Sequence, residues 1–317
     1  MKRPLNHPPY HLRLNKAIDR FIFIEVIKKL EKLSDLSEYT YFSLGGPYLE
    51  DFRLLNEFCP EIGMVSIEES PETYKRQKFH KPCKTLRLEV SKFSSFLAEY
   101  DSNDKKSVFW LDYTKLNLEV LEDFKVALEQ VATNSIVKIT LQAMPGDYKD
   151  PIKAEDFRKV FSAFLADPAA NPPLLLDDFL IMLRDMVQIA TEQALPATGS
   201  MMFQPLTSFH YADGATMFTL TGIVCQRVDQ KKIRNLFKNW HWANLDWGKP
   251  KLINIPFLST KERLHLQKHL PLKKNTGRGL LKILGYTLDG DKDSSMLMLK
   301  QYADFYRYFP YFVKAMP

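Results

Sequence analysis

Long apolar runs and closely spaced cysteines are both missing from this chain of 317 residues. No apolar stretch approaches the roughly 20 residues that a membrane-spanning helix needs. The basic first residues are not followed by the apolar stretch of a secretory signal. The three cysteines lie far apart and in no ligand spacing, which favours reduced structural thiols over disulfides. We therefore expect a cytoplasmic protein.

Familiar metal and triphosphate motifs are also missing. The seven histidines form no His-Glu-x-x-His pair, and although His265 and His269 could share one helical face, solvent-facing side chains are the better interpretation. The loop Lys273 to Gly279 is basic and glycine-containing, so it could contact a phosphate, but it lacks the Gly-x4-Gly-Lys-Ser pattern. The sequence predicts no metal site and no triphosphate loop.

What the chain does contain is a concentrated positive charge. The formal net charge is +6, and residues 227–282 hold 14 Lys or Arg against three Asp or Glu, so the remainder is slightly acidic. Such segregation favours a phosphate-rich partner, above all nucleic acid, although a solvated surface is the alternative. Tryptophans stand among these cations and could stack bases, or they could belong to the core. The candidate nucleic-acid-binding residues are Lys238, Trp240, Trp242, Lys273, Lys274 and Arg278.

Apolar runs alternate with helical patterns through the first half of the chain. Helices are expected at 15–32, 47–58, from Ser70 to before Pro82, at 91–99 and at 116–132, and strands at 41–44, 64–67, 84–89, 107–112 and 135–141. Alternation of this kind predicts an α/β fold with a doubly wound, mostly parallel sheet.

The second half of the chain departs from this alternation. Residues 151–200 read as a helical insertion, a lid or a partner surface. Two β-type runs, 201–210 and 216–226, are joined by an Asp-Gly turn signal and predict a closing antiparallel hairpin. We expect one domain at 1–226, with an extended arm at 1–12, and a basic, aromatic-rich region at 227–317. Its stretch Tyr302 to Phe312 holds seven aromatics and could dock on the body, a protein partner or a second copy.

The ends of the predicted strands carry the candidate ligand site. Gly45 and Gly46 follow the first strand, Glu68 and Glu69 the second, and Asp112 with Tyr113 the fourth. Glycines let a ligand approach the backbone, and an acid at a strand end can accept hydrogen bonds from ribose hydroxyls. The helix before the first strand begins with Asn15, Lys16 and Arg20, which could reach the same ligand.

These motifs resemble those of a known enzyme family. Tyr-Phe-Ser-Leu-Gly-Gly-Pro, Ser-Ile-Glu-Glu and Trp-Leu-Asp-Tyr-Thr are similar to class I S-adenosylmethionine-dependent methyltransferases with a Rossmann-like fold, and in particular to uncharacterised bacterial proteins classed as O-methyltransferases. The resemblance implies S-adenosylmethionine as cofactor and Asp112 and Tyr113 as catalytic residues facing the methyl group. The cofactor-binding residues that it implies are Ser43, Gly45, Gly46, Glu68, Glu69 and Asp112.

The chain departs from the family pattern at two points. The usual first motif has an acid before three spaced glycines, whereas this chain has Ser43-Leu44-Gly45-Gly46-Pro47, and no Asn-Pro-Pro-Tyr follows the fourth strand. The leading hypothesis is a methyltransferase acting on an anionic, nucleic-acid substrate. The alternative is a methyltransferase-like subunit without catalysis that binds nucleic acid or a protein. A third hypothesis is an enzyme for another nucleotide such as NAD.

Overall fold

The computed structural model describes residues 13–102, 105–274 and 276–309. The extended arm predicted for residues 1–12 and the last aromatics of the C-terminal stretch lie outside these ranges. In the part described, no helix is long and apolar enough to cross a membrane.

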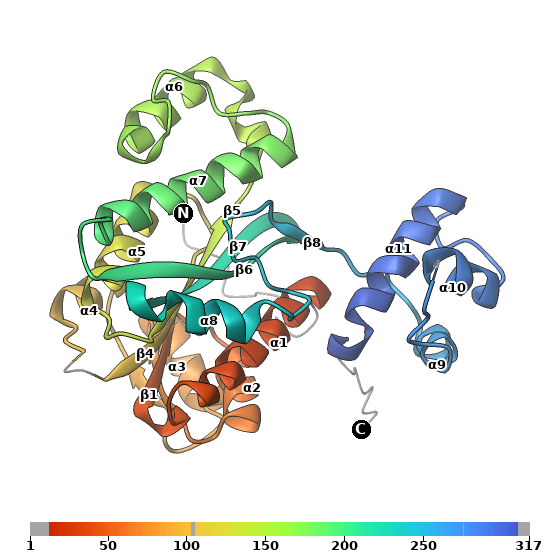
Figure 1. The fold of residues 1–317 in the computed structure, drawn as a ribbon, viewed down its shortest axis with the longest axis horizontal. Helices are drawn as coiled ribbons and strands as arrows, with labels where there is room; N and C mark the ends of the chain where they lie inside the picture. The colour runs from red at the N-terminus through yellow and green to blue at the C-terminus, as the bar shows by residue number, and fades with distance from the viewer. Residues whose placement is uncertain (1–12, 103–104, 275, 310–317) are drawn as a thin grey trace.

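An eight-stranded sheet with the order β3-β2-β1-β4-β5-β7-β6-β8 forms the centre of the molecule (Figure 1). Strands β1 to β5 pair in parallel, and β7 is antiparallel to both β5 and β6. This confirms the predicted doubly wound, mostly parallel sheet with an antiparallel hairpin. The strands are β1 (Tyr39–Ser43), β2 (Gly63–Ile67), β3 (Arg87–Glu89), β4 (Lys106–Asp112), β5 (Ile136–Gln142), β6 (Met201–Asp213), β7 (Ala215–Gln226) and β8 (Lys251–Ile253).

Helices cover both faces of the sheet. One apolar core forms beneath α1, α2 and α8, and the other beneath α4, α5 and α7. The helices are α1 (Leu14–Lys29), α2 (Glu50–Phe58), α3 (Pro71–His80), α4 (Phe93–Glu99), α5 (Leu118–Gln130), α6 (Pro151–Phe161), α7 (Leu176–Ala194), α8 (Gln230–Phe237), α9 (Thr260–Gln267), α10 (Thr276–Leu284) and α11 (Lys292–Phe305).

Local sequence signals explain where these elements begin. The side chain of Ser70 accepts the backbone N–H of Thr73 with Pro71 at the first helical position, and Ser259 and Glu262 form a capping box at α9. The central strands β4 and β5 are buried over almost their whole length, as expected for strands covered on both faces. The start of α3 agrees with the predicted helix from Ser70.

The hairpin β6–β7 is longer than predicted and lies inside the sheet. Strand β8 pairs in parallel with β6 and forms the edge beyond it. This three-residue strand comes from the basic region, so residues 227–317 contribute to the same sheet. Such a strand is too short to show an alternating pattern in the sequence.

Within the insertion, the two helices have different surroundings. Phe179, Leu183 and Val187 of α7 are buried against the sheet layer, whereas α6 lies on the far side of α7 (Figure 1). The longer helix therefore completes the layer formed by α4 and α5.

Three helices, α9, α10 and α11, form a small unit beside the first helix (Figure 1). Their buried side chains Leu280, Leu299 and Tyr302 pack in one cluster with Leu14 and Ile18 of α1. The aromatic stretch, as far as it is described, thus docks on the body of the protein.

Candidate functional site

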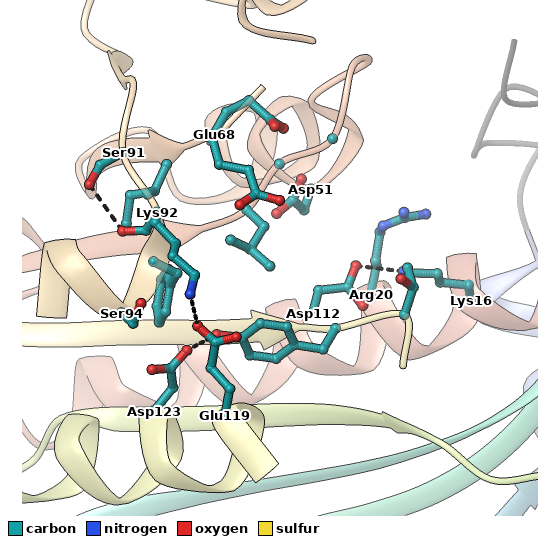
Figure 2. Close-up of a pocket in the computed structure, with 18 residues that line it drawn as sticks. Lys16, Arg20, Asp51, Glu68, Ser91, Lys92, Ser94, Asp112, Glu119 and Asp123 are labelled. Atoms are coloured by element: carbon teal, nitrogen blue, oxygen red, sulfur yellow. Dashed lines mark hydrogen bonds and ion pairs between the residues drawn. The ribbon is translucent and has the colours of Figure 1, made fainter. Parts of the chain in front are cut away.

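A cavity of about 220 Å³ opens where β1, β2 and β4 end. It is lined mainly by the loops after these strands and by polar side chains from α1, α2 and α5 (Figure 2). Its lining consists of Lys16, Arg20, Leu44, Gly45, Gly46, Asp51, Ile67, Glu68, Glu69, Ser91, Lys92, Phe93, Ser94, Asp112, Tyr113, Thr114, Glu119 and Asp123. Every predicted cofactor-binding residue except Ser43 lies in this lining.

The glycine turn after β1 is held tightly. Gly45 and Gly46 have φ values of +63° and +55°, and a Cβ on Gly45 would lie 2.5 Å from Ser66 Oγ. Buried Gln77 of α3 donates to the Gly46 carbonyl over 3.0 Å and accepts from Ser66. A side chain would therefore strain the backbone and collide with the next strand. The turn continues past Pro47, so α2 begins only at Glu50 and not at Pro47 as predicted.

The two acids after β2 are placed differently. Glu68 is half-buried, and its Oε1 accepts the backbone N–H of Ser70 over 2.8 Å, whereas Glu69 is exposed. Both still line the cavity. Either can offer carboxylate oxygens to a ligand from the β2 side.

Asp112 ends β4 and is already paired with a cation. Lys16 Nζ lies 2.5 Å from Asp112 Oδ2 (Figure 2). The other oxygen, Oδ1, is buried and has no hydrogen-bond partner among the described residues. One acceptor atom of Asp112 therefore remains for a ligand.

Tyr113, which follows β4, also lines the cavity. Its hydroxyl donates to Asp123 of α5. Burial, reinforced by the negative charge of Asp123, raises the pKa of Tyr113 well above its usual range. Tyr113 thus keeps its proton, and its hydroxyl is engaged by Asp123. Nearby, Lys92 pairs with Glu119 at 2.5 Å.

Long-range contacts bring α1 to the strand ends. The carboxylate of Asp213, in the hairpin turn, accepts the backbone N–H groups of Asn15 and Lys16. Deeper in the sheet, Lys138 of β5 forms a buried ion pair of 2.7 Å with Asp19. Together these contacts fix the two cations that the sequence suggested could reach the ligand.

Arg20 is the second of these cations. Its side chain is buried (7% exposed), and its Nε has no hydrogen-bond partner among the residues described. In Figure 2 it extends from α1 on the side of the cavity where Asp51 and Asp112 lie.

Asp51 is a cavity residue that the sequence reasoning missed. It stands in the first turn of α2, accepts a hydrogen bond from the Tyr41 hydroxyl and is also bonded by Ser43. Burial raises the pKa of Asp51. Ser43 therefore lies behind Asp51 instead of lining the cavity. An acid at a helix start was visible in the sequence, but its reach to the strand end depends on the turn after Gly46.

The predicted nucleic-acid residues do not form a single site. Lys238 lines a shallow hollow with Lys231 and Arg234, and Arg278 lines another with Lys282 and Lys292. Lys273 and Lys274 are exposed on the loop before α10.

The two tryptophans do not stand free among these cations, which corrects that part of the prediction. Trp242 is 5% exposed, stacks on Phe305 with ring centres 4.4 Å apart and donates to the Tyr308 hydroxyl. The indole N–H of Trp240 donates to Glu25 over 3.1 Å. Their rings are used to attach the C-terminal region to the body. Within the described ranges, no three His, Cys, Asp or Glu side chains are grouped as a metal site.

Comparison with known proteins decides the family. Residues 8–317 match the model of a family described as "Putative O-methyltransferase". The chain belongs to this family. The resemblance found in the sequence is thereby confirmed, and the family implies S-adenosylmethionine as methyl donor. No curated protein sequence matches this family member.

Solved structures resemble this chain only in overall fold and at low sequence identity. Trm1 from Pyrococcus horikoshii, solved with S-adenosyl-L-methionine, is 12% identical with a TM-score of 0.46, over 66% of this chain and 55% of that one. A probable spermidine synthase from Corynebacterium glutamicum is 11% identical with a TM-score of 0.43, over 78% and 81%. This O-methyltransferase-family chain thus spans about half the length of the Pyrococcus protein.

Proposed function

We propose that the chain binds S-adenosylmethionine in the cavity and transfers its methyl group to an anionic acceptor, with nucleic acid as the acceptor class. The observation that carries the proposal is the meeting of Gly45, Glu68 and Asp112 at one end of the parallel strands. Ligands of doubly wound sheets bind at this edge.

The residues present fit such a cofactor. Gly45 and Gly46 bring backbone to the cavity wall, and Glu68 or Glu69 can accept hydrogen bonds from ribose hydroxyls. The lining has more acidic than basic side chains, which suits a cation. S-adenosylmethionine, when bound, supplies a methyl group on a positively charged sulfur, so alignment is the main demand on the protein.

Two groups of the chain would act near the methyl acceptor. The ring of Tyr113 offers a packing surface, and Asp112 Oδ1 is the acceptor atom available for the proton of an acceptor hydroxyl. Lys16 would hold Asp112 in place through the other oxygen. In this proposal Asp112 is catalytic and Lys16 is a positioning residue.

The basic region supports an anionic substrate. Arg278, Lys282 and Lys292 surround one exposed hollow without a carboxylate in its lining. The unit that carries them packs on α1, the helix that also brings Lys16 and Arg20 to the cavity.

A second candidate function is a methyltransferase-like subunit that binds nucleic acid or a protein partner without catalysis. The pairing of Asp112 with Lys16 favours it, because the expected base is already engaged. The glycine motif, which lacks the usual acid, also favours the subunit without catalysis.

Calorimetry with S-adenosylmethionine tests the proposed cofactor. Binding should be lost or weakened at least about tenfold when Glu68→Ala and Glu69→Ala are combined, because ribose hydrogen bonds to charged acceptors disappear. The control combines Glu57→Ala with Glu61→Ala, which removes the same charge from exposed positions outside the cavity. No binding by the unaltered protein, or equal binding by both double variants, contradicts the proposal.

Titration with DNA and RNA at several salt concentrations separates the two candidates. Phosphate contacts give an affinity that falls steeply with salt. A steep slope together with cofactor binding supports the methyltransferase, and a steep slope without it supports the subunit. An affinity that does not change with salt excludes nucleic acid as the ligand in both candidate functions.

A further inference from the structure

Three cations and three carboxylates form one charge cluster at the α1 side of the cavity, and all of them except Asp51 and Asp112 are buried. They are Lys16, Arg20, Lys138, Asp19, Asp51 and Asp112, and their charges act on one another electrostatically. The cluster is balanced in formal charge. Because an extra buried charge is costly unless it is paired, a ligand group bound here should itself be neutral overall.

The cluster can still offer a ligand both a hydrogen-bond donor and a hydrogen-bond acceptor. Arg20 Nε is a buried donor without a hydrogen-bond partner among the residues that the structure describes. Asp51, held by Tyr41, offers a carboxylate in the cavity lining. A group that carries one positive and one negative charge would satisfy these atoms together.

We propose that Arg20 and Asp51 form a clamp for the α-amino acid end of the cofactor. Arg20 binds the carboxylate, and Asp51 binds the ammonium group. This inference rests on the proposed function and extends it to the recognition of one part of the ligand.

In the clamp, Asp51 replaces the acid that the glycine motif lacks. Ser43 occupies the end of β1, where the usual motif has its acid, and Ser43 is bonded to Asp51. The carboxylate is therefore supplied from the first turn of α2 to the same end of the strand. Its place depends on the left-handed turn through Gly45, Gly46 and Leu49 that delays the helix.

Three thioethers, whose sulfur carries no charge, test the clamp by calorimetry. S-adenosylhomocysteine has the complete amino acid end, its decarboxylated analogue keeps only the amine, and methylthioadenosine lacks both. The unaltered protein should bind the first at least about tenfold more tightly than the last, the order expected for a charge-assisted hydrogen bond. Equal affinity for these two ligands would overturn the inference.

Substitutions assign the two halves of the clamp. Arg20→Gln should weaken S-adenosylhomocysteine about tenfold and leave the two ligands without a carboxylate within about threefold. Asp51→Asn should weaken both amines and spare methylthioadenosine. Arg53→Gln, at an exposed position of α2, is the control and should change none of them.

The outcomes separate this inference from the proposed function. Equal weakening of all three ligands by Arg20→Gln and Asp51→Asn indicates a structural effect and overturns the clamp while cofactor binding stands. Failure of the unaltered protein to bind any thioether or S-adenosylmethionine overturns the proposed function as well. If Arg20→Gln does not fold, the ligand series and Asp51→Asn still decide the matter.

Discussion

The cavity edge of the sheet and the α9–α11 unit both carry many charges, but they carry them differently. Behind the cavity, the side chains of Lys138 and Asp19 are 1% and 2% exposed and paired with each other. In the α9–α11 unit, Arg278 and Lys282 are exposed around a shallow hollow. The charge density along the sequence predicted the exposed cations of the α9–α11 unit but did not predict the buried ion pair.

The difference follows from the cost of burying a charge. An exposed lysine keeps its hydration, so many can gather in one segment with little effect on the fold. A buried lysine needs a partner of opposite charge, and here the partners come from distant parts of the chain. The buried charges should therefore matter for stability and ligand geometry, and the exposed ones for long-range attraction.

The largest effect is expected from Lys138→Ala. The change leaves Asp19 buried without its cation, and it removes the ammonium group that lies 4.2 Å from the centre of the Trp110 ring. Loss of one partner of a buried pair costs about 3–5 kcal/mol in the free energy of unfolding. Urea denaturation followed by circular dichroism measures it.

The control for this prediction replaces both partners. Lys138→Met combined with Asp19→Leu should recover most of the loss, because apolar side chains of similar size remove the uncompensated charge. A double variant as unstable as Lys138→Ala would show that the pair itself, rather than the unpaired acid, carries the stability.

Gly45→Ala should have the next largest effect. Its left-handed φ of +63° and the 2.5 Å approach of a Cβ to Ser66 Oγ both oppose a side chain. We expect a loss of about 1–3 kcal/mol together with weaker cofactor binding. Gly285→Ala is the matched control, because Gly285 also has a positive φ but nothing within 4 Å of its Cβ position. Equal losses of stability in the two variants would show that the approach of a Cβ to Ser66 does not contribute.

The same contrast explains what the sequence could predict. The five parallel strands, the hairpin, the cap at Ser70 and the glycine turn depend on neighbouring residues, and all were predicted. The position of Asp51 depends on where a turn ends, and the burial of Trp242 depends on Phe305, more than sixty residues away. Contacts of this kind leave no periodic pattern in the sequence.

A pH dependence of ligand affinity should follow from Asp51. Burial raises its pKa, Arg20 and hydrogen bonds from Tyr41 and Ser43 oppose the rise, and the charge of Asp112 adds to it. A bound ammonium group favours the ionised carboxylate. Below the raised pKa, binding must release a proton, so affinity falls as pH falls.

The limit of this effect is about tenfold per pH unit for a single proton. Calorimetry with S-adenosylhomocysteine across the acid range measures it, with Asp51→Asn as the variant that lacks the proton. If the affinity of Asp51→Asn falls with pH as steeply as that of the unaltered protein, the titrating group is not Asp51.

The smallest effect is expected from Lys282→Ala, an exposed cation of the α9–α11 unit. Its stability should change by less than about 0.5 kcal/mol, as is usual for surface positions. If Lys282 contacts a phosphate, the slope of log affinity against log salt for RNA or DNA should fall by about 0.9. The control is Lys153→Ala, which removes one positive charge from an exposed position on α6. This variant should leave the slope unaltered. Equal slopes for the two variants would show that net charge, and not the hollow around Arg278, attracts the nucleic acid.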